Sequence, residues 1–212
     1  MRGAAAGLPA LLAALILSAC STQAPAPDSN ALPPPVAPQL SEQERWQARL
    51  SALGTLGDWR VRGKVAYRLP DDAGSASLDW QQSGAQSALR LSGPLGVGST
   101  EIRNEGALLR VQRDGIERLY PADAAPWLPG GTLLPVPVAS IQHWLRGAPD
   151  PALPVTAIER NNALATFLEQ DGWEIRYSDY ENYRGLAMPS RMTLKAPQAK
   201  LSLRVILRDW DY

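Results

Sequence analysis

The chain has 212 residues, with 21 Lys plus Arg and 21 Asp plus Glu, so its formal net charge is zero. This balance argues against a duplex nucleic-acid binder and against a polybasic membrane anchor, because both need an excess of basic side chains. A single cysteine excludes an internal disulfide framework and a cysteine-rich zinc site, and a single histidine leaves few routes to histidine-based catalysis.

Residues 1–19 have the pattern of a secretory signal peptide. Arg2 precedes an uncharged apolar run over residues 8–17, which is too short for a membrane-spanning helix of about 20 residues. The run leads into LSAC at 17–20, which resembles the bacterial lipobox, where the cysteine receives diacylglycerol on its thiol and a third acyl chain on its amino group. We therefore predict cleavage before Cys20 and lipidation of Cys20. An ordinary signal peptide is the alternative, but it would leave the only cysteine of the chain unexplained.

Residues 20–40 are predicted to form an extended tether. The segment is rich in Pro, Ala and Gln, includes three successive prolines at 33–35, and cannot bury a core. Ser21 follows the lipidation position, and by the sorting rule of enteric bacteria it indicates passage to the outer membrane. The folded domain would then occupy residues 41–212.

The domain is expected to open with an amphipathic helix. Ser41 and Glu44 have the spacing of a capping box, and Trp46, Leu50 and Leu53 follow on one helical face. Glycine directly after Leu53 predicts the end of this helix.

After this helix the apolar period changes from 3.6 to 2, which is typical of half-buried antiparallel strands. Alternation predicts strands over 59–69, 76–81, 89–92, 100–102, 109–111, 116–120, 164–170, 173–177, 192–194 and 201–207. The pairs Asp114-Gly115 and Asp171-Gly172 predict hairpins. A helix over 137–146 and a short helical turn over 123–128 interrupt the strands. So many sequential strands should curl into a barrel or half-barrel, with the helices covering its open side or one end.

The sequence offers no catalytic constellation and no metal site. It contains no G-x-S-x-G, H-E-x-x-H or P-loop motif. His143 on the predicted inserted helix is best explained as a structural or solvent-facing residue, and Asp71-Asp72 as a solvated turn. We therefore expect that the protein is not an enzyme.

An apolar loop tip interrupts the strands at Pro94, Leu95 and Gly96. Loops are usually polar at their tips, so Leu95 needs an explanation. The residues alone leave two interpretations open: Leu95 folds back to plug one end of the barrel, or it contacts an apolar partner.

At this loop the chain resembles the outer-membrane lipoprotein receptors of the lipoprotein-localisation pathway, the LolB family. The resemblance covers roughly residues 42–210 and rests on the order and spacing of several motifs. These are the lipobox at Cys20, the Trp46 helix, and residues 59–67, 79–82, 94–96, 99–101, 141–147, 172–177 and 188–189. It implies a mainly β fold with a few helices: an incomplete, strongly curved antiparallel β-barrel with an α-helical lid over an apolar cavity.

The resemblance also implies a function. Members of this family accept acylated lipoproteins from a soluble periplasmic carrier, here a LolA-like protein, and insert them into the inner leaflet of the outer membrane. The protein would act as a periplasm-facing monomer, bind its clients through their acyl chains, and need no cofactor beyond the covalent lipid on Cys20.

The family's membrane-inserting loop residue falls on Leu95, although Val97 and Gly98 make this loop longer than the family pattern. Eight apolar residues are candidates for the lining of the acyl cavity, and an ordinary core role is equally compatible with each. They are Leu78, Trp80, Leu89, Leu91, Leu109, Ile141, Trp144 and Trp173.

Two other functions remain as alternatives. A lipid-anchored envelope scaffold would have a filled core and would bind no acyl chains. A lipid-modifying or peptidoglycan enzyme would need the catalytic groups that the motif search does not find.

Overall fold

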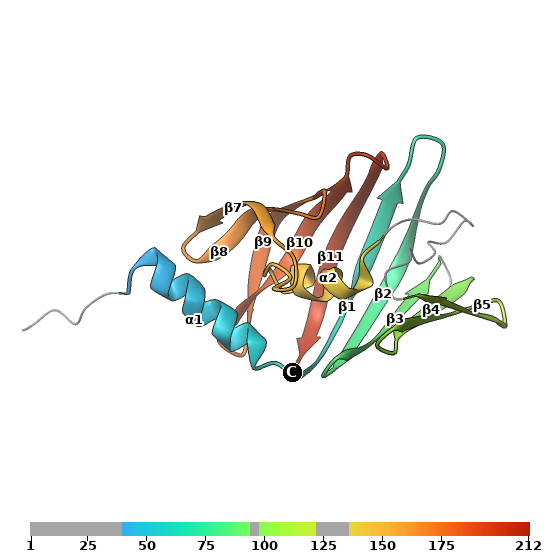
Figure 1. Cartoon of the computed structure of the whole chain (residues 1–212), viewed down its shortest axis with the longest axis horizontal. Coiled ribbons are helices and arrows are strands. Elements are labelled where there is room, and N and C mark those ends of the chain that lie inside the picture. The colour runs from blue at the N-terminus through green and yellow to red at the C-terminus, as the bar shows by residue number, and fades with distance from the viewer. Residues whose placement is uncertain (1–39, 94–97, 122–135) are drawn as a thin grey trace, which may run out of the picture. The chain divides into compact units, whose positions relative to one another are not determined.

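The computed structural model describes residues 40–93, 98–121 and 136–212, which belong to a single unit that spans Gln39–Tyr212. One antiparallel sheet of eleven strands and two helices make up this unit (Figure 1). None of the helices within the described ranges is both long and apolar enough to cross a membrane.

The sheet consists of two meanders that meet where the first and last strands pair. Its order is β6-β5-β4-β3-β2-β1-β11-β10-β9-β8-β7. The strands are β1 Asp58–Arg68, β2 Ala73–Ser83, β3 Gln86–Ser92, β4 Ser99–Asn104, β5 Leu108–Arg113, β6 Ile116–Pro121, β7 Val155–Asn161, β8 Leu164–Gln170, β9 Trp173–Tyr183, β10 Leu186–Ala196 and β11 Leu201–Asp211. Because β6 and β7 are its two edges, the sheet is open. The prediction of a mainly β, incomplete barrel is confirmed, and the closed-barrel alternative is wrong.

Helix α1, Glu42–Gly54, begins at the predicted capping box. Ser41 Oγ accepts a hydrogen bond from Glu44 N at 3.2 Å, and Glu44 Oε2 accepts one from Ser41 N at 2.7 Å. The buried face of the helix consists of Trp46, Arg49 and Leu53, whereas Leu50 is half-buried. An arginine therefore takes the place in the core that the periodicity assigned to Leu50.

Helix α2, Val138–Leu145, lies against the middle of the sheet, and the two groups of edge strands lie on either side of it (Figure 1). Pro137 precedes its first residue and Arg146 follows its last, as the predicted span of 137–146 requires. The predicted helical turn over 123–128 lies outside the described residues.

A close approach between the central strands requires glycine at position 63. Gly63 pairs with Leu78 of β2 and with Leu207 of β11. A Cβ atom on Gly63 would lie 2.1 Å from the backbone oxygen of Ile206, which no side chain can tolerate. This contact joins the two meanders at their seam.

Both predicted Asp-Gly hairpins are confirmed. Asp114 and Gly115 have φ angles of 49° and 77°, and Asp171 and Gly172 have 52° and 72°. Positive φ at both turn residues is the geometry that Asp-Gly favours in a two-residue hairpin. The sequence did not predict strand β7, and it ended β9 six residues too early, at Tyr177.

Candidate functional site

An apolar row crosses five strands on the inner face of the sheet, the face that carries α2. Cross-strand pairing places Val61, Trp80, Leu89, Ile102 and Val111 side by side from β1 to β5. We call these five residues the inner apolar row. Four of them are buried and Leu89 is partly buried. From β1 to β5, every paired position of this row is therefore apolar.

The five cavity candidates on β2, β3 and β5 belong to this face. Trp80 and Leu89 are partners within the row, and Leu78 pairs with Leu91 in the neighbouring row. Leu109 of β5 is 1 % exposed. Alternation therefore assigned these five side chains to one face correctly, although it could not distinguish a cavity from a packed core.

Trp80 is the anchor of an aromatic cluster at one end of the row. Its ring stacks on Trp59 with centroids 6.1 Å apart and an interplanar angle of 7°, and Trp210 lies 5.4 Å from Trp59 on the other side. Trp80 Nε1 donates a hydrogen bond to Gln82 Oε1 at 3.1 Å. Trp59 was missing from the expected cavity residues, although it lies two positions before Val61 and so shares its face.

The remaining three cavity candidates lie on helix α2 and strand β9. Ile141 and Trp144 lie on its buried side, and the Trp144 ring lies 5.9 Å from Trp173 of β9. Tyr177 donates its hydroxyl to the Trp144 carbonyl at 3.0 Å. The candidates therefore form two groups, one on β2 to β5 and one between α2 and β9.

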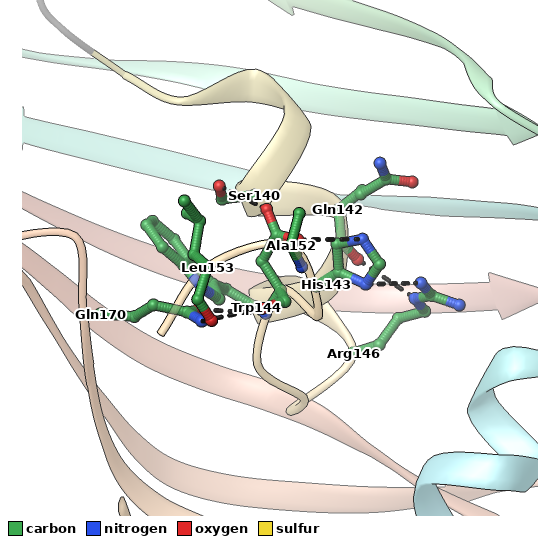
Figure 2. A network of polar contacts seen from close by, with 9 residues as sticks. Ser140, Gln142, His143, Trp144, Arg146, Ala152, Leu153 and Gln170 are labelled. Atoms are coloured by element: carbon green, nitrogen blue, oxygen red, sulfur yellow. Dashed lines mark hydrogen bonds and ion pairs between the residues drawn. The ribbon is translucent and has the colours of Figure 1, made fainter. Parts of the chain in front are cut away.

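The side chain of Gln170 joins α2 to the sheet (Figure 2). Its Oε1 accepts from Trp144 Nε1 and from Asp150 N, each at 2.9 Å. Its Nε2 donates to the carbonyls of Asp150 and Leu153 at 2.8 and 3.0 Å. The side chain is fully buried, so all four of its hydrogen bonds are made away from water. This residue was not predicted, although it lies two positions after the inward-facing Leu168.

Two buried arginines join the C-terminal ends of the two helices. Arg146 Nη1 donates to the Leu53 carbonyl at 2.8 Å, and Arg49 Nη2 donates to the Arg146 carbonyl at 3.0 Å. Each guanidinium also lies over an aromatic ring, Arg146 over Trp59 and Arg49 over Tyr180. Burial lowers the pKa of both groups. Helix C-termini attract positive charge, which offsets part of the cost of burying these cations.

Burial and the neighbouring Arg146 guanidinium lower the pKa of His143 below its ordinary value of 6.5, while Asp150 acts in the opposite direction. The unfolded chain therefore binds a proton more readily than the folded chain. This contribution to stability is present above about pH 6.5 and is lost as the pH falls through the lowered pKa.

We expect the free energy of unfolding to decrease between about pH 7 and 5, and His143→Gln to flatten that decrease. Urea unfolding at a series of pH values measures it. An equal pH dependence in the wild type and in His143→Gln would show that other groups are responsible.

Four buried polar atoms have no hydrogen-bond partner in the described part of the chain. They are Arg49 Nε, Trp59 Nε1, Thr100 Oγ1 and Asn104 Oδ1. Thr100 is fully buried and pairs with Leu91, so its hydroxyl lies among the inner apolar side chains.

Two expected sites fall outside the described residues. These are the lipidation site Cys20 and the loop residues Pro94, Leu95 and Gly96. The strands that flank the loop are described, and Ser92 of β3 pairs with Ser99 of β4.

Hollows lined by described residues occur away from the inner apolar row. Two of them, of about 430 and 470 Å3, lie beside the hairpin between β2 and β3, and Gln81 and Ser83 line both. Across residues 40–93, 98–121 and 136–212, no group of three acidic, histidine or cysteine side chains is placed to hold a metal ion. The expected acyl cavity therefore remains a prediction.

Comparison with solved structures identifies the fold. A LolA superfamily protein from Nitrosomonas europaea superimposes with a TM-score of 0.56 at 12% identity, covering 82% of this chain and 94% of that one. A DUF1329 family protein from Desulfovibrio piger gives a TM-score of 0.54 at 9% identity, over 79% of this chain and 90% of that one. At these identities the likeness concerns the fold alone.

Sequence relatives extend over nearly the whole chain. An outer-membrane lipoprotein LolB of Alkalilimnicola ehrlichii is 35% identical over 94% of this chain and 94% of its own length. One from Cellvibrio japonicus is 31% identical over 95% of this chain and 94% of its own length. The family model described as outer membrane lipoprotein LolB matches residues 57–210. The chain therefore belongs to the LolB family of outer-membrane lipoproteins.

Proposed function

We propose that this protein accepts acylated lipoproteins from a periplasmic carrier and inserts them into the inner leaflet of the outer membrane. The observation that carries the proposal is the membership of the LolB family combined with the inner apolar row. A strip of five apolar side chains on the sheet face that carries α2 offers an acyl chain a surface shielded from water. No catalytic step is part of the proposal.

The proposed anchor is the lipid on Cys20. Removal of residues 1–19 would expose the cysteine for diacylglycerol and an N-linked acyl chain, and residues 20–40 would tether the folded domain 41–212 to the outer membrane. At about 0.8 kcal/mol per buried CH2, two or more chains anchor a protein stably. The anchor would thus keep the acceptor at the membrane that it serves.

The same arithmetic explains why clients need an acceptor. Each acyl chain costs on the order of 10 kcal/mol to expose to water, so a lipoprotein cannot cross the periplasm unaided. Transfer from a LolA-like carrier to this domain and then to the membrane needs no nucleotide if each acceptor binds the chains better than the last.

Leu95 is the proposed membrane-inserting residue, held between Pro94 and Gly96. An apolar side chain at a loop tip can enter the bilayer surface and open a path for the acyl chains. We expect Leu95→Glu to accept cargo from the carrier but to deliver it to membranes at least tenfold more slowly, because a carboxylate is costly to bury among lipid tails.

The test is a two-stage transfer assay. A carrier loaded with an acylated lipoprotein is mixed with wild type or Leu95→Glu, first without membranes and then with them, and Leu95→Met serves as the conservative control. Uptake by all three forms with slow delivery by Leu95→Glu alone supports the proposal. No uptake by the folded wild type would rule out the acceptor function.

Deep burial of the inner side chains favours a second candidate function. Trp80 is 0 % exposed and Leu109 is 1 % exposed, as expected for a filled core in a lipid-anchored envelope scaffold that binds no acyl chains. An apolar fluorescent probe separates the two functions. Probe binding that acylated lipoprotein displaces supports the acceptor, whereas a folded domain that leaves the probe dark supports the scaffold.

A further inference from the structure

The outer face of the three central strands carries basic side chains that no described acidic group neutralises. They lie on β1, β10 and β11, are exposed, and form no ion pair within residues 40–93, 98–121 and 136–212. These side chains are Lys64, Arg68, Lys195, Arg204 and Arg208. The uncompensated charge is notable in a chain with a net charge of zero.

On the neighbouring strands β3 to β5, the outer basic side chains are paired with acidic ones. On the outer face of β3 and β4, Glu101 forms ion pairs with both Arg90 and Arg103. On β5, Arg110 bonds to Glu105 and to Glu117. On the central strands themselves, Arg60 and Arg62 of β1 form ion pairs with Asp79, and Arg191 of β10 forms one with Asp179. The five unpaired basic side chains therefore stand out among neighbours whose charges are neutralised.

A hollow of about 230 Å3 is bordered by two of these unpaired basic side chains, Arg68 and Arg204, and by Ser202, with Tyr67 and Gly74 also in its lining. Pairing places Arg68 beside Ser202, and Arg204 two residues further along the same face of β11. The other lining residues include Ala66 and Ala73, whose small side chains leave the floor open. Two guanidinium groups and a hydroxyl thus border one shallow recess.

The carboxylates closest in sequence do not fill this recess. Asp71 and Asp72 form no ion pair with Arg68, and Asp72 instead accepts the Tyr67 hydroxyl at 3.1 Å. Gly74 leaves room for the Tyr67 ring, which a Cβ atom there would meet at 2.6 Å. Tyr67 itself is buried and alternates with Arg68 along β1, yet it still lines the hollow, so the bond to Asp72 is made at the edge of the recess. The two guanidiniums remain available for an external anion.

We propose that this hollow binds the phosphodiester headgroup of an anionic phospholipid. Guanidinium groups bind phosphate oxygens through paired N–H donors, and the Ser202 hydroxyl can donate a third hydrogen bond. The recess is open to solvent, so a headgroup at a membrane surface can reach it. The binding site needs no cargo and no helix movement.

The choice of a lipid over a free phosphate rests on the proposed function. A protein that delivers acyl chains must meet a membrane, and the hollow lies at the sheet end where the segment between Ser92 and Ser99 leaves β3 and returns to β4. Strand β1 ends at Arg68 on the same end of the sheet. Headgroup binding here would hold that end of the sheet at the bilayer.

The experiment measures binding of the domain from Gln39 to Tyr212, which has its own core and complete sheet and therefore folds without the preceding residues. Flotation compares phosphatidylglycerol-containing vesicles with phosphatidylcholine vesicles. The test variant is Arg68→Gln with Arg204→Gln. The matched control is Lys195→Gln with Arg208→Gln, which removes the same charge from the same face outside the hollow.

We expect the test variant to bind phosphatidylglycerol vesicles about twenty-five-fold more weakly than the wild type, at about fivefold for each of the two basic residues, and the control to lose clearly less. If both variants lose vesicle binding equally, the whole basic face attracts the membrane diffusely and the proposed site is wrong. Inorganic phosphate that abolishes vesicle binding at low concentration would overturn the lipid source. If the test variant loses cargo uptake from the carrier but still binds vesicles, the hollow binds an acidic protein surface and not a lipid headgroup.

Failure of this proposal is distinguishable from failure of the proposed function. Vesicle flotation is measured without cargo, and cargo uptake is measured without vesicles. A domain that takes up cargo but ignores phosphatidylglycerol contradicts only the headgroup site, whereas a domain that floats but takes up no cargo contradicts only the acceptor function.

Discussion

Replacing Gln170 with leucine should lower the free energy of unfolding by about 3 kcal/mol, although the two side chains are similar in size. The change leaves the donors Trp144 Nε1 and Asp150 N without an acceptor in a fully buried site, and it removes the donor to two carbonyls. Each orphaned buried group costs about 1 to 3 kcal/mol. Urea unfolding followed by tryptophan fluorescence measures the loss.

Gln142→Leu is the matched control for this prediction. Gln142 lies on α2, the helix that Gln170 joins to the sheet, and carries the same amide, but that amide makes no hydrogen bond in the described part of the chain, and Figure 2 shows it pointing away from Gln170. Its replacement should change stability by less than about 0.5 kcal/mol. Similar losses in both variants would mean that the four hydrogen bonds of Gln170 do not hold α2 on the sheet.

Trp80→Ala should cost about 4 kcal/mol of unfolding free energy, the largest stability effect that we expect from a single truncation. The side chain is 0 % exposed, stacks on Trp59, and pairs with Val61 of β1 in the inner apolar row, so its removal opens a cavity beside the strand that joins the two meanders. Chemical denaturation measures the change.

Two control variants are needed to interpret the effect of Trp80→Ala. Trp80→Phe keeps a ring against Trp59 but removes the donor to Gln82, so it should lose clearly less stability than Trp80→Ala. Ser77→Ala changes an exposed residue of the same strand and should be close to neutral. If Trp80→Ala is no more destabilising than Trp80→Phe, the stacked ring contributes little to the core.

Local chemistry made much of this fold predictable. The capping box at Ser41 and the Asp-Gly hairpins specify their own backbone geometry within four residues, so no distant contact is needed to recognise them. Strands such as β1 were also predictable, because one face is buried and the other carries charge, which imposes a strict alternation.

Strand β7 and the turns after β7 and β9 were not predicted, because β7 lies at an edge of the sheet and the turns use unusual residues. Strand β7 is an edge strand whose two faces are both largely exposed or half-buried, so its sequence carries no alternation. Its turn to β8 consists of Asn162 and Ala163, with φ angles of 48° and 60°. The turn after β9 consists of Arg184 and Gly185, with φ angles of 46° and 88°. Neither pair is Asn-Gly or Asp-Gly, so the usual signal was missing.

Long-range contacts determined the parts of the site that the sequence could not reveal. Arg49 and Arg146 are buried only because two helix ends, 93 residues apart where Arg146 bonds Leu53, come together. Considered alone, an arginine is expected at the protein surface, because this residue type is mostly exposed. The inner face of the candidate site was therefore predictable from alternation, whereas the contacts that join the helices were not.

The alternation of β1 to β5 has a consequence for protein engineering. Inner and outer residues occupy alternate positions, so the outer pair Arg90 and Glu101 can be swapped or replaced without changing the inner pair Leu89 and Ile102. A library that varies only the outer positions would change isoelectric point and crystal packing and would leave the interior intact. The protein thus offers two separate design surfaces on the same strands.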